Sequence, residues 1–334
     1  MKTRIYLLIL SIISVSCVAS SDTGDHMHIS LIADVKNLDI SSKAGSVYPV
    51  AASPFEAISS SSPLEAKVLF SFNKSQFPDN PQEPYFIPCH TKVTFKDHNL
   101  TFVDYYPNGA SIPQQLKYPT DGTDRTVYCA GFYPADGWTF ENGSASYEID
   151  GTKDVMFADV ISGDWNTQLP VQNYRHMQSW VKVLASANTI EAATNWGSVT
   201  KISIETEKGF TITYPGSSDA SSTIAYSDGD LKYLDLFENT DGVPLSITFS
   251  EIGSAFLIPP ASCELTVKVC TTVFPEGKYA KVKLYDLDNT LITDRSRTIG
   301  KLFVLNLNFT NLSVIEGVCT LNYWNDQDGD LYLQ

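Results

Sequence analysis

The 334-residue sequence has few histidines, few cysteines and a shortage of basic residues, and each shortage limits what the protein can do. It holds five His and six Cys without a CxxC pair or other metal-ligand spacing, so it gives no support for a metal centre. Lysine and arginine total 23 against 38 acidic residues, and the formal net charge is -15. Nucleic acids need a basic face, so we exclude them as partners.

Catalytic motifs are also missing, because no GxSxG, HExxH, P-loop or GxGxxG pattern occurs. His26 and His28 could form a metal pair, but tether and strand-edge positions explain them better. His176 is interpreted as a packing residue at a strand start. Asn325–Asp330 lacks the glutamate that completes a calcium loop and is interpreted as an acidic tail. We therefore expect neither an enzyme nor a metal or other cofactor.

The residues that are abundant point to β-structure. Hydrophobic residues make up 43% of the chain and aromatic residues 12%, enough for sizeable cores rich in strand-forming side chains. The length suits two domains. Alternating apolar positions are clearest at residues 263–273, 278–284 and 301–309, and 245–249 shows the same alternation. One buried face and one wet face are typical of antiparallel sandwiches, so we predict an all-β fold.

One stretch, Tyr133–Asp159, reads as two strands around a sharp turn. Tyr147 approaches the turn and Phe157 leaves it, and Asp150-Gly151 supplies the positive-φ position that a tight reversal needs. We predict a hairpin here.

The N-terminus predicts export. Lys2 and Arg4 precede the apolar run Ile5–Ile13, which is too short to cross a bilayer as a helix, and small residues lead to Cys17. This pattern resembles a bacterial lipobox, which implies that Cys17 is acylated and holds the protein in the outer membrane. Cleavage near Ala19, releasing a secreted protein, is the alternative.

The other cysteines leave their pairing open. Cys263 and Cys270 are seven residues apart, so on one strand they face opposite sides and cannot bridge each other. We expect most to be small buried residues, while one disulfide could form after export.

The order of several motifs resembles the fimbrillin family, the pilus subunits and related surface lipoproteins of Bacteroidales. Tyr133-Pro134, Ile149-Asp150-Gly151 and Asp154–Ala158 follow in family order, and Phe256–Pro260 and Gly300-Lys301 match later family features. The resemblance implies two tandem transthyretin-like antiparallel β-sandwich domains. They would occupy residues 28–171 and 172–334, after a signal peptide at 1–16 and a tether at 17–27.

The resemblance also implies a mode of assembly. In family stalk subunits a trypsin-like protease cuts beyond the first strand, that strand leaves, and a strand from another subunit fills the groove by β-strand addition. Here the displaceable strand would be His28–Lys36, and its face would be formed by Ile29, Leu31 and Ala33. The candidate cut sites are Lys36 and Lys43.

The role within a pilus stays open. An Arg-specific protease has no site between Arg4 and Arg125, so the chain could be a stalk subunit, a tip adhesin or an anchor at the cell surface. The implied partners are other fimbrillin subunits, a lipid anchor and a host glycan or protein ligand. The alternative is a non-polymerising surface lipoprotein that binds glycans through exposed tryptophans. The candidates are Trp138, Trp165, Trp196 and Trp324, although core packing is the usual role of such residues.

Overall fold

The computed structural model describes residues 32–35, 64–71, 86–96, 99–107, 111–112, 116–118, 126–141, 143–213, 222–311 and 314–322. Its strands are β1 (Ile32–Val35), β2 (Leu64–Ser71), β3 (Phe86–Lys96), β4 (Asn99–Pro107), β5 (Val127–Tyr133), β6 (Trp138–Glu141), β7 (Ser144–Glu148), β8 (Met156–Gly163), β9 (Gln172–His176), β10 (Ser179–Ala187), β11 (Ser198–Glu207), β12 (Gly209–Thr213), β13 (Thr223–Tyr226), β14 (Leu231–Pro244), β15 (Ser250–Leu257), β16 (Glu264–Thr271), β17 (Lys278–Tyr285), β18 (Leu302–Phe309) and β19 (Ile315–Asn322). The helices are α1 (Ile190–Trp196) and the 3-10 turn η2 (Arg295–Arg297). The all-β prediction is confirmed.

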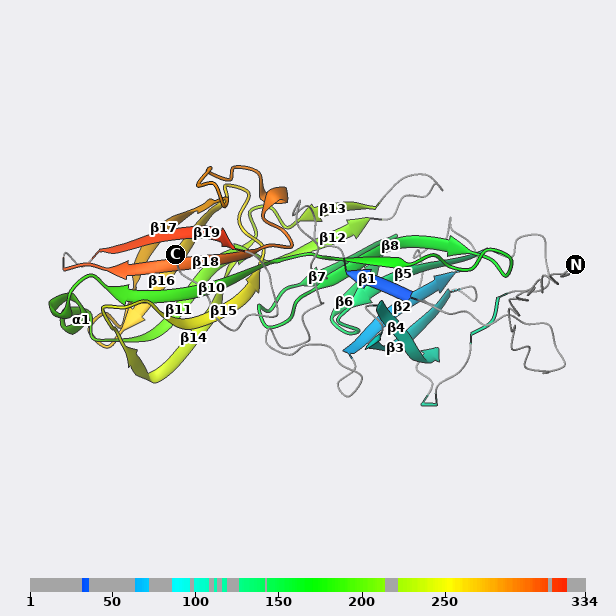
Figure 1. The fold of residues 1–334 in the computed structure, drawn as a ribbon, viewed down its shortest axis with the longest axis horizontal. Helices are drawn as coiled ribbons and strands as arrows, with labels where there is room; N and C mark the ends of the chain where they lie inside the picture. The colour runs from blue at the N-terminus through cyan, green and yellow to red at the C-terminus, as the bar shows by residue number, and fades with distance from the viewer. Residues whose placement is uncertain are drawn as a thin grey trace, which may run out of the picture.

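The N-terminal strands close into a barrel in the order β1-β4-β3-β2-β5-β8-β9 (Figure 1). Its neighbouring strands pair antiparallel except for β1 with β9, and the pairs β2-β3, β3-β4 and β8-β9 join strands that are consecutive in the chain. The closure depends on β1, which pairs antiparallel with β4 and parallel with β9.

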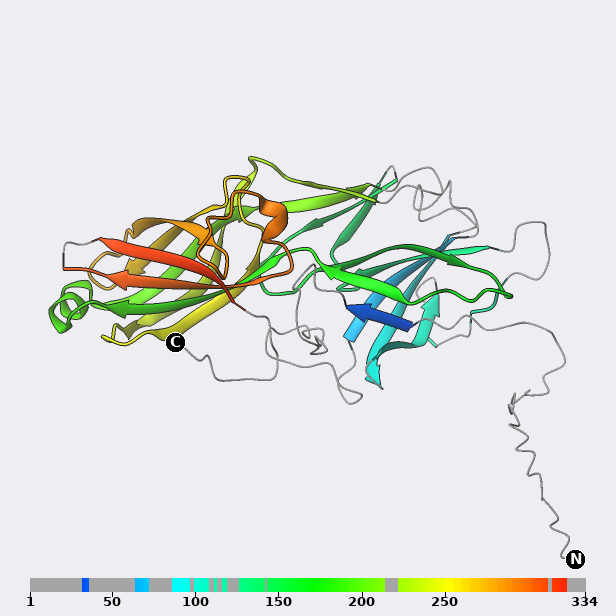
Figure 2. The same ribbon diagram turned by 45° about the horizontal axis from the view of Figure 1, so that its top comes forward.

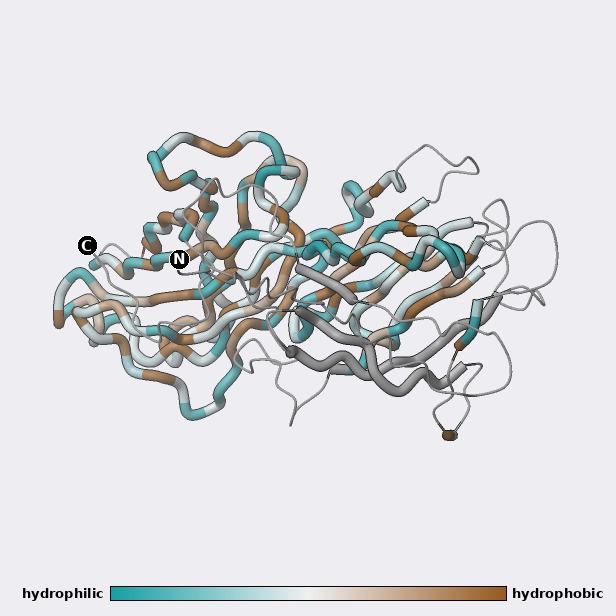
Figure 3. Tube along the Cα trace, turned by 45° about the vertical axis from the view of Figure 1, so that its right-hand side comes forward, coloured by the Kyte–Doolittle hydropathy of each residue, from teal (hydrophilic) through white to brown (hydrophobic). Residues whose placement is uncertain are grey.

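The C-terminal strands form an eight-stranded sheet in the order β14-β11-β16-β17-β19-β18-β10-β15. The sheet wraps around one core, and its first and last strands are consecutive in the chain. They approach closely at Gly253, where an added Cβ would lie 2.4 Å from the Leu236 carbonyl oxygen. The period-two alternation predicted here is confirmed, because Val282, Leu284 and Phe303 are buried. Figure 3 shows the alternation of hydrophobic and hydrophilic residues along the strands.

A third sheet, which we call the joining sheet, connects the N-terminal half of the chain, which forms the barrel, to the C-terminal half, which forms the eight-stranded sheet. Its order is β13-β12-β7-β6, so strands from early in the chain pair with strands from late in it (Figure 2). Phe132 of the barrel packs edge-on against Trp138 at 4.9 Å, and Trp138 packs against Phe210 at 5.7 Å. One continuous apolar core therefore runs from the barrel into the C-terminal sheet. The division at residues 171 and 172 stays a prediction; β9, which starts there, pairs with β8 and β1.

The hairpin predicted around Gly151 is wrong in its pairing. Gly151 does adopt a positive φ of 82°. However, β7 pairs with β6 and β12, whereas β8 pairs with β5 and β9. The segment carries the chain from one sheet to another, and tertiary hydrogen bonds replace a hairpin ladder: Ile149 N donates to Lys208 O, and Phe256 N donates to Gly151 O.

Two further expectations differ from the structure. Residues 245–249 connect β14 to β15 and do not form a strand, and Val273 lies beyond β16 with half of its surface exposed. The short helix α1 was not predicted, because seven residues are too few to show a helical period. Among the described residues no helix is long and apolar enough to cross a membrane.

Candidate functional site at the barrel seam

The closure of the barrel around β1, which we call the seam, is the feature that strand exchange would use. Ile32 and Ala33 pair with Thr101 and Leu100 of β4. On the other side Ala33, Asp34 and Val35 pair in parallel with residues 172–174 of β9. A four-residue strand forms only short ladders, and parallel pairing is slightly weaker per residue than antiparallel. Departure of β1 would leave the edges of β4 and β9 unpaired, which is the arrangement that strand addition requires.

The buried face of β9 forms one wall of the seam. Gln172, Tyr174 and His176 are buried in alternation, at most 3% exposed, while Asn173 is exposed. Tyr174 reaches across Ala158 to the backbone of β5, so that a Cβ added to Gly131 would lie 2.0 Å from its hydroxyl oxygen. The absence of a side chain at position 131 is what lets this ring pack there.

Gln172 is poorly satisfied for a fully buried amide. Its Nε2 lies 3.5 Å from Cys129 O and 3.7 Å from Cys129 Sγ, at the long limit of hydrogen bonding. Its Oε1 has no hydrogen-bond partner among the described residues. Burying an amide group without good partners costs about 1–3 kcal/mol. The wall of the seam next to β1 is therefore less stable than an apolar wall would be.

The other end of β9 is held by a buried ionisable pair. His176 Nδ1 lies 2.6 Å from Asp154 Oδ2, and both side chains are at most 1% exposed. The following residues continue the attachment, since Met177 N donates to Val155 O, and Val155 N donates to Gln178 Oε1 at 2.8 Å. Thus β9 is anchored to the start of β8 at one end and lies against β1 at the other.

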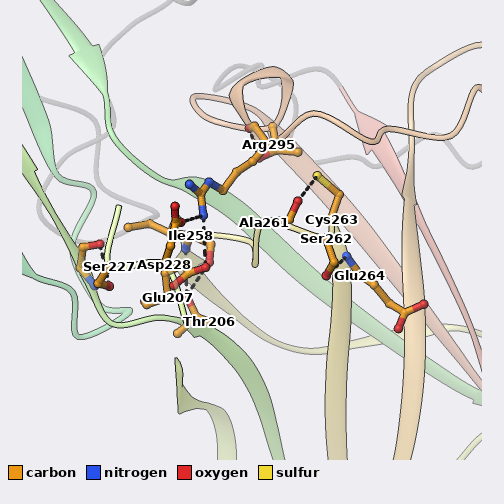
Figure 4. A network of polar contacts seen from close by, with 12 residues as sticks. Thr206, Glu207, Ser227, Asp228, Ile258, Ala261, Ser262, Cys263, Glu264 and Arg295 are labelled. Carbon is orange, nitrogen blue, oxygen red and sulfur yellow. Dashed lines mark hydrogen bonds and ion pairs between the residues drawn. The ribbon is translucent and has the colours of Figure 1, made fainter. Parts of the chain in front are cut away.

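A second polar network ties the C-terminal half to the joining sheet (Figure 4). Arg295 Nη1 lies 3.1 Å from Glu207 Oε1 and 2.8 Å from Asp228 Oδ1, and its guanidinium lies 4.1 Å from the centre of the Tyr226 ring. Burial raises the pKa of the Glu207 carboxyl, and the Arg295 charge opposes that shift. Thr206 of the same strand end is hydrogen-bonded to the backbone of Ile258. The ion pairs and hydrogen bonds of this network connect segments that are distant in the chain. We therefore interpret the network as stabilising the fold and not as a catalytic site.

The structure places few of the predicted site residues. Ala33 lies in β1 at the centre of the seam. Cys17, Lys36 and Lys43, together with Ile29 and Leu31, lie outside the described residues, as does Asn325–Asp330. Across the part of the chain that is described, no group of three or more His, Cys, Asp or Glu could hold a metal ion.

The structure also places three of the tryptophans that were candidates for glycan binding, and His176. Trp138 and Trp196 are 8% and 1% exposed, so they pack in the core and cannot form a stacking platform. Trp165 is half-buried, and Trp324 lies outside the described residues. His176 is buried, but it pairs with Asp154 and ends β9, whereas the sequence predicted a packing residue at a strand start.

Four cysteines have side chains that the structure describes, and these four form no disulfide bond with one another. Cys129, Cys263 and Cys319 are buried, which agrees with the expectation of small apolar residues, while Cys270 is partly buried. Sequence reasoning missed Gln172, Asp154 and the Arg295 network, because their roles come from pairings between distant strands and no local pattern marks them.

Comparison with known proteins supports the fold. No protein-family model matches the chain, and no curated protein matches it. A solved structure of a proposed cell adhesion protein from Bacteroides uniformis superposes with a TM-score of 0.53 at 12% identity, covering 91% of this chain and 100% of that one. A proposed cell adhesion protein from Bacteroides ovatus gives 0.49 at 12%, covering 91% and 99%. A fimbrial assembly protein from Parabacteroides distasonis gives 0.37 at 10%, covering 89% and 100%. The first similarity shows a shared fold over nearly the whole chain.

Proposed function

We propose that this chain is a fimbrillin-like protein of the bacterial cell surface that acts in adhesion or pilus assembly through β-strand exchange at the seam. The observation that carries the proposal is the position of β1, a four-residue strand that pairs with both β4 and β9 and closes the barrel between them. The fold shared with the Bacteroides uniformis protein agrees with it.

Assembly would begin with proteolysis. A trypsin-like protease cuts after Lys36 or Lys43, and β1 is then attached only by its short ladders. When β1 leaves, a longer strand from another copy pairs with the edges of β4 and β9. Backbone hydrogen bonds supply the affinity, and the buried face of β9, with Gln172 and Tyr174, sets the register. A longer strand makes more hydrogen bonds than β1 does, which favours exchange.

Export would place the protein where this assembly occurs. Acylation of Cys17 after removal of residues 1–16 would anchor a copy in the outer membrane, and residues 17–27 would act as a tether. A Cys17→Ala variant should lose acylation and leave the membrane fraction. Unchanged membrane retention of this variant would contradict the anchor.

Limited trypsin digestion tests the assembly proposal. The purified protein is digested, the fragments are identified by mass spectrometry, and the products are sized. We expect cleavage after Lys36 or Lys43 followed by long oligomers, and a Lys36→Gln, Lys43→Gln variant should stay monomeric under the same treatment. Cleavage at these sites without oligomers would contradict strand exchange and favour a non-polymerising surface protein that binds a host glycan or protein.

A further inference from the structure

Five large apolar side chains are exposed on segments that follow β10, β14, β16 and β18, at the end of the C-terminal sheet where Figure 1 shows α1. They come from α1, from the β14–β15 connection and from the turns after β16 and β18. The exposed fractions are Ile190 74%, Ile247 59%, Phe249 42%, Val273 51% and Val314 50%. We call this set the apolar tip. Single exposed aliphatic residues are ordinary, but a group gathered from several loops at one pole is typical of an interaction surface.

Hydrogen bonds and close contacts show that the segments carrying the tip lie side by side. Ala187 N donates to Ser246 O at 2.7 Å, which sets the β14–β15 connection beside the end of β10. Thr189 Oγ1 lies 3.1 Å from Asn311 Oδ1, which joins the start of α1 to the end of β18. A Cβ added to Gly197 would lie 3.1 Å from a Val273 methyl group, so the end of α1 touches the β16–β17 turn.

A buried tryptophan on α1 packs against the end of β18 and the β16–β17 turn, which fixes three of the four segments relative to each other. Trp196 is 1% exposed, and its Nε1 donates to Thr310 O at 2.8 Å. Its ring lies 4.8 Å from the Phe274 ring and 5.0 Å from the Phe309 ring. The tip is thus a surface on a packed support, ready to bind without a large ordering cost.

Each of the four loop segments carries an exposed glutamate within three residues after its apolar residue. The pairs are Ile190 with Glu191, Phe249 with Glu251, Val273 with Glu276 and Val314 with Glu316. None of these glutamates forms an ion pair with another residue that the structure describes. The nearby Lys278 places its Nζ over the Phe274 ring at 4.9 Å. Each glutamate lies one to three residues along the chain from an exposed apolar residue, and we call the four glutamates the acidic rim and the apolar side chains the centre of the tip.

We propose that the apolar tip binds an amphipathic, basic segment of a partner protein, with apolar side chains against the centre and Lys or Arg against the rim. Apolar burial would supply most of the affinity, and the rim charges would steer and select the partner. A second copy docked through the same surface would set glutamate against glutamate. An anionic bilayer would be repelled as well, since the chain carries a formal charge of -15. This contact goes beyond the proposed strand exchange and does not depend on it.

A fluorescent synthetic amphipathic peptide made only of Leu and Lys serves as the probe, and an equivalent Leu and Glu peptide is its control. Binding is followed by fluorescence anisotropy. We expect the Leu/Lys peptide to bind, and an Ile190→Ser, Phe249→Ser variant to bind it at least tenfold more weakly. A Glu191→Lys, Glu316→Lys variant should weaken it similarly and flatten its salt dependence.

Matched variants far from the tip keep the test specific. Val171→Ser removes an apolar side chain that is 44% exposed at the barrel, and Glu141→Lys reverses an exposed charge on β6; both should bind like wild type. Thermal unfolding verifies that each variant is folded. Trypsin-induced oligomerisation of the Ile190→Ser, Phe249→Ser variant should be unchanged. A loss of peptide binding at the tip can therefore be told apart from a loss of strand exchange at the seam.

Four results would overturn the proposal. They are equal binding of the Leu/Glu peptide, unchanged binding by the tip variants, self-association that the tip variants abolish, and binding to phosphatidylcholine vesicles that the tip variants abolish. The last two would assign the tip to a second copy or to a lipid surface.

Discussion

Gly131 is the residue at which the barrel interior leaves no room for a side chain. A Cβ there would overlap the Tyr174 hydroxyl group at 2.0 Å, so Gly131→Ala must displace the ring. Overpacking of this kind costs about 1–3 kcal/mol, and we expect that loss in denaturant unfolding. A Tyr174→Leu change should cost less in the Gly131→Ala background than in wild type. Equal costs in both backgrounds would show that the two residues do not compete for space.

Glu207 gives a pH dependence whose sign follows from its burial. Its folded pKa is raised above the reference value of 4.5, mainly by burial, so the folded state favours the protonated carboxyl. Its contribution to stability is then complete below pH 4.5 and is lost as pH rises through the raised folded pKa. We therefore expect the free energy of unfolding of wild type, measured relative to that of Glu207→Gln, to decrease as the pH rises from 4.5 through the folded pKa of Glu207.

Urea unfolding of both proteins at a series of pH values measures this difference. A wild-type advantage that grows with pH instead would mean that the Arg295 charge outweighs burial at Glu207.

At the scale of the strand, Gln172 should set how readily β1 leaves. Gln172→Met keeps the length of the side chain and removes the poorly satisfied amide from the wall of the seam, which we expect to stabilise the seam by about 1 kcal/mol. Hydrogen exchange at the β1 backbone should then slow by about fivefold. Asn173→Met, on the exposed side of β9, is the matched control and should change little. Faster exchange in Gln172→Met would show that the amide helps to hold the strand.

The sequence predicts most of the strands but little of the seam. Period-two alternation is strong where one face is buried and the other wet, as at Val282 and Phe303, and those strands were located correctly. The partners of a strand depend on tertiary contacts, so β7 and β8 read as a hairpin although they belong to different sheets. Gln172 is polar in sequence and buried in the fold, which no local pattern reveals. The loop at 245–249 has strand-like alternation, yet Leu245 packs against the core while Ile247 and Phe249 are exposed.

For the whole molecule, the joining sheet should make the two halves depend on each other. Phe210 belongs to the later half, but it packs against Trp138 and pairs with Tyr147 of the earlier half. Phe210→Ala should cost about 3–5 kcal/mol and speed hydrogen exchange in β6 and β7. Tyr279→Ala removes an aromatic ring that is 60% exposed on β17 and should leave those strands unaffected. Unchanged exchange of β6 and β7 in Phe210→Ala would show that the halves are independent.

The central claim is that β1 is the strand exchanged between copies, and a disulfide lock tests it directly. Ala33 and Leu100 are directly paired on antiparallel strands, so Ala33→Cys with Leu100→Cys can join β1 to β4. After trypsin digestion the oxidised variant should stay monomeric, and added reductant should release β1 and start the growth of oligomers like those of wild type. Oligomers that grow equally well from the oxidised, locked protein would contradict strand exchange at this seam.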